Sequence, residues 1–257
     1  MKIFSISDLH LPGTENKTME KFGENWLNHV SKIESHWQEK IAKEDYVLIP
    51  GDTSWAMNLE GAYPDFEFLA FLPGKKIFVK GNHDYALGKE ERTKLYLKSL
   101  DNDISTMRLI HNDGYIIKNN KDSIIGIIGT RGWGINPLSE EKDKKILNRE
   151  LARLQHSFQF LKSIKVDKIV AMVHFPPTNQ ITQFFDQSNS KTEENDLNYV
   201  EKYDNRFFEY LKSVNVDCIV FGHVHNIKIK NPLEIDGIKI YCTSCDNIDF
   251  NPIEINF

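Results

Sequence analysis

Residues 76–84 read Lys-Ile-Phe-Val-Lys-Gly-Asn-His-Asp, a short apolar run that ends in a glycine and three polar side chains. A run of this length rich in Ile, Phe and Val is typical of a β-strand that is covered on both faces. The glycine permits a sharp turn and a close approach of the backbone to a ligand. The segment therefore predicts a buried strand followed by a loop that carries Asn82, His83 and Asp84.

Similar apolar runs recur along the chain, and helical patterns lie between them. In the stretches from Trp26 to Ile41 and from Leu147 to Leu161, apolar residues repeat at steps of three and four, as on one face of a helix. The alternation of the two patterns predicts α/β layers. Two further apolar stretches are candidates for additional strands, but the sequence leaves open their order in the sheet and their direction. The apolar runs are residues 2–6, 46–49, 124–128, 168–173 and 218–221, and the two further stretches are residues 238–242 and 253–255.

Polar clusters follow five of these predicted strands. Because ligands of α/β sheets bind beyond the carboxyl ends of the strands, we expect residues that are distant in sequence to converge there. Imidazoles mixed with carboxylate and amide oxygens suit Mn, Fe, Ni or Zn, whereas Mg and Ca prefer oxygen ligands alone. The sequence thus predicts a transition-metal site. The clusters are Asp8-Leu9-His10, Gly51-Asp52, residues 81–84, His174 and residues 222–225, which read Gly-His-Val-His.

These residues resemble the calcineurin-like metallophosphoesterase family, whose ordered signature is D-x-H, G-D, G-N-H-D/E, a lone His and G-H-x-H. The match extends from Asp8 to His225. The resemblance implies a four-layer αββα sandwich of two mixed β-sheets flanked by helices, and two divalent transition-metal ions bridged by Asp52. It assigns the remaining ligands to one ion held by Asp8, His10 and His225 and a second held by Asn82, His174 and His223.

The resemblance also implies a hydrolytic mechanism. The two ions would lower the pKa of a shared water, and the resulting hydroxide would attack phosphorus in line with the leaving group. His83 would act as the general acid that protonates the departing alkoxide, and Asp84 would hold the His83 ring through its other nitrogen. The implied enzyme is a phosphatase or a phosphodiesterase.

Position 55 departs from the wider family. Relatives of the purple acid phosphatase type place a Tyr ligand three residues after the bridging Asp, and many others have an acidic or amide residue there, whereas this chain has Trp55. Redox chemistry through an iron-bound tyrosinate is therefore disfavoured. The stretch from Gly51 to Met57, Gly-Asp-Thr-Ser-Trp-Ala-Met, resembles a bacterial subgroup of predicted phosphohydrolases with a GDxSWAM-type motif, which fixes no substrate.

Three further residues are candidate substrate contacts. Arg131 follows a predicted strand, and its guanidinium is suited to a phosphate or carboxylate, although a structural salt bridge or a solvated loop explains it as well. Trp55 and Trp133 have rings that are able to stack on a base, although packing is the favoured interpretation. The polar stretch over residues 183–199 is interpreted as a lid or specificity loop, or as a solvated insertion.

Composition narrows the function classes. The 257 residues, 40% hydrophobic and 27% charged, predict one large globular domain over residues 1–257. A net charge of -5 argues against a dedicated nucleic-acid binder. Three cysteines provide no disulfide framework, and no segment reads as a signal peptide or membrane span, so a cytoplasmic location is expected. The sequence leaves the oligomeric state open.

The favoured interpretation is a dinuclear metallophosphoesterase that acts on a small phosphorylated molecule or nucleotide. A non-catalytic scaffold on the same fold is one alternative, and a nuclease is another. A scaffold with a decayed site should lack some ligands, but all seven and His83 are present. The acidic balance and the absence of a basic, aromatic-rich appendage count against a nuclease.

Overall fold

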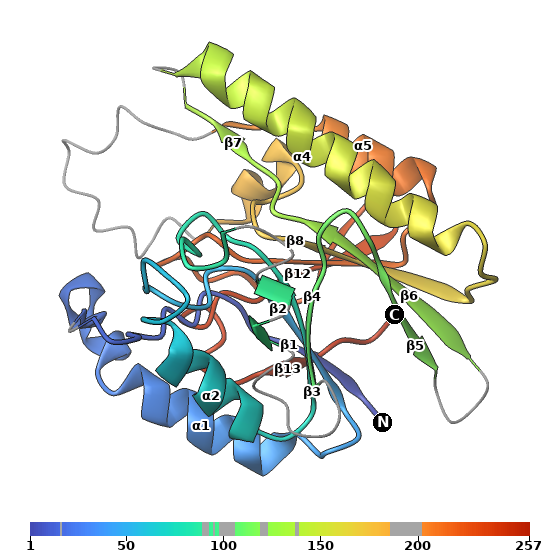
Figure 1. Ribbon diagram of the computed structural model, residues 1–257. Helices are drawn as coiled ribbons and strands as arrows, with labels where there is room; N and C mark the ends of the chain where they lie inside the picture. Colours follow the sequence, from blue (N-terminus) through green and yellow to red (C-terminus); the bar gives the residue numbers. More distant parts are fainter. Residues whose placement is uncertain are drawn as a thin grey trace.

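Two large β-sheets pack face to face, and helices cover their outer faces (Figure 1). The computed structural model describes residues 1–15, 17–88, 93–94, 96–97, 106–118, 123–136, 139–185 and 202–257. The arrangement confirms the predicted four-layer α/β sandwich of mixed sheets.

The first sheet has five strands, of which four run parallel and β13 runs antiparallel at one edge. Helices α1 (His29–Lys40) and α2 (Tyr63–Phe71) cover its outer face, where Trp37 and Phe66 share one buried core with the strand residue Val47. In spatial order the strands are β13 (Ile253–Glu254), β1 (Ile3–Ser5), β2 (Tyr46–Pro50), β3 (Lys75–Val79) and β4 (Met107–Leu109).

The second sheet has six strands, with four parallel strands at its centre and an antiparallel strand at each edge. Helices α4 (Glu140–Leu161) and α5 (Arg206–Ser213) cover its outer face through residues such as Leu154 and Phe208. In spatial order the strands are β11 (Leu233–Ile235), β12 (Ile238–Cys242), β10 (Cys218–Phe221), β8 (Lys168–Val173), β6 (Ile124–Thr130) and β5 (Tyr115–Lys118).

The inner faces of the two sheets form a third buried core. Leu48 and Ile77 from the first sheet belong to it together with Met172 and Val220 from the second. Burial on both faces explains why the central strands are continuous apolar runs and do not alternate between polar and apolar residues. Shorter elements complete the described structure: 3-10 turns at Glu20–Phe22, Glu24–Trp26 and Asn179–Phe184, and a two-stranded ribbon of β7 (Gly134–Ile135) and β9 (Lys202–Tyr203).

The six apolar runs predicted as strands form strands, within two residues at either end, and the two further apolar stretches form β12 and β13. The first predicted helix begins at His29, later than expected, because Trp26 belongs to a 3-10 turn. Helices α2 and α5 were not predicted. Of the stretch at 183–199, residues up to 185 belong to the 3-10 turn and its C-cap, and residues 186–199 lie outside the described residues. No helix among the described residues is long and apolar enough to cross a membrane.

The carboxyl ends of the strands in both sheets meet at one edge of the sandwich. The backbone N–H of Ser7 after β1 donates to the carbonyl of Thr243 after β12 at 2.8 Å. Within the sheets, the N–H of Asp8 donates to Gly51 at 3.0 Å, and that of Gly222 donates to His174 at 3.1 Å. These bonds fix the strand-end loops of the two sheets against each other.

Candidate metal centre

Seven side chains from five strand-end loops converge where the two sheets meet. In the first predicted ligand set, Nε2 of His10 lies 3.3 Å from Nε2 of His225, which lies 3.6 Å from Oδ1 of Asp8. In the second set, Oδ1 of Asn82 lies 2.6 Å from Nε2 of His174 and 3.1 Å from Nδ1 of His223. The structure therefore brings together every residue that the sequence predicted as a ligand.

Asp52 lies between the two sets. Its Oδ2 atom is 3.9 Å from Nε2 of His10 and 3.5 Å from Nε2 of His174. Its Oδ1 atom accepts a hydrogen bond from the backbone N–H of His83 at 2.8 Å, which fixes the carboxylate in place. One carboxylate oxygen is thus within reach of a ligand from each set.

The backbone of the ligand loops is strained. Four of the seven candidate ligands have left-handed backbones, with φ of 56° at Asp8, 44° at His10, 52° at Asp52 and 74° at His223. Residues with a Cβ rarely adopt this conformation, and it persists only where the surrounding structure enforces it. Such positions cluster at functional sites, so the strain supports an active role for these loops.

Glycines allow the loops to pack this closely. A Cβ atom on Gly81 would overlap the Asp52 carboxylate, and a Cβ atom on Gly222 would overlap the Asp8 carboxylate. We expected the glycines to permit close approach of the backbone to a ligand. The structure shows that they permit close approach of one ligand-bearing loop to another.

The electrostatics of the cluster favour a cation. Burial raises the pKa of Asp52 well above its usual range, and the neighbouring Asp8 and Asp84 carboxylates raise it further. Burial lowers the pKa of the His10 and His174 imidazoles well below the usual value, which keeps the rings in the neutral form that binds metals. The buried carboxylates thus lack compensating positive charge, which a divalent cation would supply.

His225 shows the same shortage of positive charge. Burial alone would lower its pKa, but the hydrogen bond and charge of Asp246, with the charges of Asp8 and Asp52, raise the pKa to about 9. Within the described part of the chain, two groups of His, Asp, Glu or Cys side chains have ligand atoms within 4.8 Å of one another: Asp8, His10 and His225, and Asp8, Asp52 and His174. The residues present therefore fit a centre for divalent metals.

Two outer contacts orient the imidazoles. Nδ1 of His174 is bonded to the carbonyl oxygen of Pro50 at 2.9 Å, which leaves Nε2 directed at Asn82. Nδ1 of His225 is bonded to Oδ1 of Asp246 at 2.8 Å, and the other oxygen of Asp246 accepts from the N–H of Asn226. Carboxylates and carbonyls in this position fix the tautomer of a metal-binding histidine.

Asp246 was not predicted from the sequence. It follows β12, the strand at Ile238–Cys242 whose order and direction the sequence left open. Its only sequence signal is a single acidic residue shortly after a predicted strand end. That signal becomes useful only once β12 is known to run parallel to β10, which carries His223 and His225 at its end.

His83 faces the cluster without being part of it. Its ring centroid lies 5.8 Å from that of His10 and 4.6 Å from that of Trp55. Burial, together with the positive charges of His223, His225 and Lys17, lowers the pKa of His83 to about 4. Its Nδ1 atom is buried and has no hydrogen-bond partner among the described residues.

The expected contact between Asp84 and the His83 ring is absent from the described structure. The Asp84 carboxylate instead accepts hydrogen bonds from the backbone N–H groups of Thr53, Ser54 and Gly81 at 2.8–3.2 Å. Three amide donors hold a buried carboxylate more firmly than one neutral imidazole would. Asp84 therefore ties the loop after β2 to the loop after β3, and it positions His83 only through the backbone.

A cavity of about 140 Å³ opens beside the cluster. Its lining combines candidate ligands and His83 with apolar side chains, among them Trp26, Trp55 and Met19. The Trp55 ring stacks on the His10 imidazole with centroids 4.8 Å apart, which places an apolar ring at the position that departs from the wider family.

Arg131 and Trp133 do not line this cavity. The Arg131 guanidinium donates to the Glu150 carboxylate at 3.2 Å and lies over the Trp133 ring, 4.4 Å from its centroid. The Trp133 indole N–H donates to Asp143 at 2.9 Å. Both residues instead contact helix α4, which carries Asp143 and Glu150.

The sequence matches the model of calcineurin-like phosphoesterases over residues 1–226. The chain belongs to this family. It is therefore a hydrolase of phosphoester bonds whose Asp and His side chains are arranged to hold metal ions. The resemblance drawn from the sequence motifs is confirmed.

A solved structure with a TM-score above 0.5 agrees on the fold of this phosphoesterase. Phosphopantetheinyl hydrolase (PptH) from Mycobacterium tuberculosis is 13% identical with a TM-score of 0.64, and the match covers 99% of this chain and 95% of that one. The protein of unknown function AQ665 from Aquifex aeolicus is 16% identical, with a TM-score of 0.48 and coverage of 98% and 95%. The sequence matches no curated protein at a significant level.

Proposed function

We propose that this phosphoesterase hydrolyses a small phosphorylated molecule or nucleotide at a dinuclear centre. Asp8, His10 and His225 would hold one ion and Asn82, His174 and His223 the other, with Asp52 shared. The observation that carries the proposal is the position of Asp52 Oδ2, within 4 Å of a histidine from each set. The mixed nitrogen and oxygen donors favour Mn, Fe, Ni or Zn.

Two bound divalent cations would activate water as a nucleophile and neutralise charge on the phosphoryl oxygens. The chain prepares the site for them by keeping His10 and His174 neutral and by fixing His174 and His225 through their outer nitrogens. Asn82 adds a neutral oxygen, so the ligand set retains positive charge on the metals for the substrate. Hydrogen bonds from the strand-end loops and their neighbours hold His174 and His225 in place before substrate arrives.

His83 is the proposed proton donor to the leaving group. It lies at the cavity between the candidate ligands and Trp55 and is tied to Asp52 through its backbone N–H. Its pKa of about 4 applies to a site without negative charge from substrate. A phosphate group placed beside the ring raises that pKa towards neutrality, because a nearby anion favours the imidazolium form.

The apolar wall of the cavity supports a leaving group with an apolar or aromatic portion. Trp26, Trp55, Met19 and Phe22 line the cavity of about 140 Å³ beside the ligands. A ring or an alkyl chain would be desolvated there, while its phosphate remained at the polar wall. Nucleosides and aryl phosphates both meet this description, as does the pantetheine portion that the name of the M. tuberculosis hydrolase denotes.

The alternatives are less well supported. A scaffold that has lost catalysis would be free to lose ligands, yet all seven donors converge and four of them have left-handed backbones. A nuclease is not favoured, because the chain is acidic overall. The shared inner core of the two sheets supports treating residues 1–257 as one domain.

The test is a substrate screen with the Mn-loaded protein. Nitrophenyl phosphate, bis-nitrophenyl phosphate, nucleotides, cyclic nucleotides and phosphopantetheine are compared, with Asp52→Asn as the inactive control. The proposal expects turnover of at least one small ester that the variant loses, and the ratio of monoester to diester turnover separates phosphatase from phosphodiesterase. Turnover that persists undiminished in Asp52→Asn would contradict the proposed centre.

A further inference from the structure

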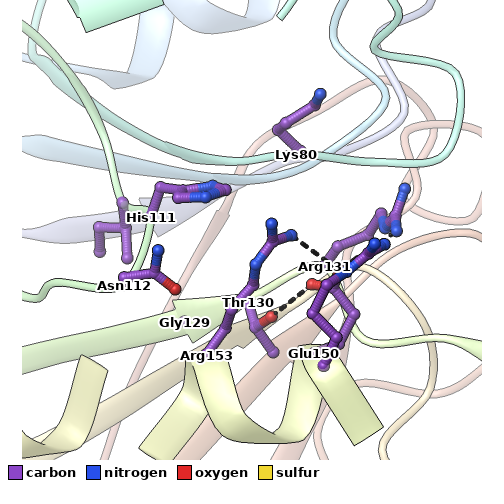
Figure 2. A pocket seen from close by; sticks show the side chains of 10 residues that line it. Lys80, His111, Asn112, Gly129, Thr130, Arg131, Glu150 and Arg153 are labelled. Atoms are coloured by element: carbon purple, nitrogen blue, oxygen red, sulfur yellow. Dashed lines mark hydrogen bonds and ion pairs between the residues drawn. The ribbon is translucent and has the colours of Figure 1, made fainter. Parts of the chain in front are cut away.

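A second cavity lies at the same edge of the sandwich, and its charged lining residues are mainly cations. It measures about 140 Å³, and Figure 2 shows Lys80 on the opposite side of it from Glu150. We call it the cationic pocket. The charged residues that line it are Lys80, Arg131, Arg149, Arg153 and Glu150.

The pocket holds more cations than its own carboxylate neutralises. Three guanidinium groups approach the same oxygen of Glu150, which is 1% exposed: Arg153 at 2.8 Å, Arg131 at 3.2 Å and Arg149 at 3.6 Å. The other Glu150 oxygen accepts from the hydroxyl of Thr130 at 2.8 Å. One carboxylate therefore faces three guanidinium groups, and Lys80 adds a fourth positive charge to the lining.

Arg131 is oriented for a further acceptor. Its side chain is 18% exposed, and its guanidinium lies over the Trp133 ring, 4.4 Å from the centroid. Its Nε atom is buried and has no hydrogen-bond partner among the described residues. A buried, unpaired donor on a cation is costly unless an acceptor from a ligand or water satisfies it.

The cationic pocket is joined to the metal centre through the backbone. Lys80 lies two residues before Asn82 in the loop after β3. The carbonyl oxygen of Arg131 accepts hydrogen bonds from the N–H groups of His174 and Phe175 at 2.9 and 3.0 Å. Loops that hold Asn82 and His174 therefore also hold two of the cations.

We propose that the cationic pocket binds a phosphate group other than the one that is hydrolysed. Planar guanidinium groups and an ammonium suit the several oxygens of a phosphate. The group would be either a second phosphate of the substrate or free inorganic phosphate. The first source rests on the proposed function, whereas binding of phosphate itself does not.

Isothermal titration of the full chain with inorganic phosphate tests the site, first on Mn-loaded protein and then after chelation. One phosphate per chain should still bind after chelation, because the cationic pocket needs no metal. Arg153→Gln and Lys80→Gln should weaken this binding at least about tenfold, while Arg153→Lys retains more of it. The matched control is Lys144→Gln on the same helix, whose cation is paired with Glu140 outside the pocket and should have no effect.

Unchanged phosphate binding in both Arg153→Gln and Lys80→Gln, with folding confirmed by circular dichroism, would overturn the proposal. So would absence of binding to chelated, folded wild-type protein. If chelation unfolds the chain, the titration of Mn-loaded protein tests the proposal instead. The pocket variants should then bind one phosphate fewer per chain than the wild type. A failure of the proposed hydrolysis would leave all of these results unchanged, so the two failures are distinguishable.

A kinetic comparison then identifies the source of the phosphate. KM is measured for nitrophenyl phosphate, which has one phosphate, and for adenosine 3′,5′-bisphosphate, which has two. A rise in KM of Arg153→Gln for the bisphosphate alone assigns the pocket to the substrate. Equal KM values in variant and wild type, together with lost phosphate binding, assign it to free phosphate.

Discussion

The metal centre and the cationic pocket are two cavities of similar size at one edge of the same sandwich, yet their charges are opposite. The metal centre gathers buried carboxylates around its imidazoles, and this negative charge raises the pKa of His225 to about 9. The cationic pocket gathers three guanidinium groups around one carboxylate oxygen and lacks negative charge. Each cavity is thus suited to one kind of charge, the first to metal cations and the second to an anion.

The difference also lies in how each cavity is built. The candidate ligands stand in strand-end loops, several with left-handed backbones, so their positions are set by the backbone itself. The cations of the second cavity come from long side chains, two of them on helix α4. We therefore expect substitutions in the metal centre to have larger effects than substitutions in the cationic pocket.

Replacement of Asp52 should have the largest effect. Asp52→Asn removes the carboxylate that lies within reach of both ligand sets. We expect kcat/KM on any ester that the wild type turns over to fall by at least about a thousandfold. Asp236→Asn, at a solvent-exposed pair with Lys212, serves as the control and should retain full activity. Near-normal kcat/KM in Asp52→Asn would contradict the expectation that substitutions in the metal centre have larger effects than substitutions in the cationic pocket.

Replacement of His83 should separate proton donation from metal binding. His83→Ala should retain metals but slow esters with alkoxide leaving groups by about 10²–10⁴-fold, because these leave only when protonated. Nitrophenyl esters, whose leaving group needs little protonation, should lose much less. Steady-state rates on both ester types check this, and equal slowing of the two would argue against the acid role.

Replacement of Gly81 tests whether loop packing sets the ligand geometry. In Gly81→Ala the new Cβ would overlap the Asp52 carboxylate and displace it. Because a displacement of about 1 Å at a reacting centre costs on the order of a hundredfold in rate, kcat/KM should fall by about that factor. Gly88→Ala is the matched control, since a Cβ there meets no atom within 4 Å. Equal activity of the two variants would contradict the expected role of Gly81.

Replacement of Asp246 should have the smallest effect of the four. Asp246→Asn removes the carboxylate that holds His225 through Nδ1. Loss of such an outer partner lowers metal affinity by about 10–100-fold, so activity should recover at high Mn concentration. Titration of activity against Mn measures the shift. A loss of kcat that saturating Mn does not rescue would place Asp246 closer to the chemistry than we propose.

The central strands were predictable because burial on both faces makes each of them a continuous apolar run. Residues 76–79 and 168–173 are examples, and both form strands. Helix α2 escaped prediction because apolar residues surround it on most sides, so its 3.6-residue period is weak, as the sequence of Tyr63–Phe71 shows. Strand β4, at Met107–Leu109, is too short to produce a clear pattern.

The candidate ligands were predictable because each follows a strand, and all but the lone His174 form part of a local motif. Asp246 was not predictable, because its position beside His225 depends on the parallel pairing of β12 with β10, which sequence alone leaves open. Of the cations in the cationic pocket, the sequence identified only Arg131 as a candidate substrate contact. Arg149 and Arg153 read as ordinary solvent-facing residues of a helix, and only the packing of α4 against β6 brings them together with Lys80.

The most direct test of the central claim is the metal content of the full chain. Protein purified without chelator is loaded with Mn, dialysed and analysed by inductively coupled plasma mass spectrometry beside Asp52→Asn. The proposed dinuclear centre predicts close to two ions per wild-type chain and a marked loss in the variant. Far fewer than two ions in the wild type, or equal metal content in both proteins, would contradict it.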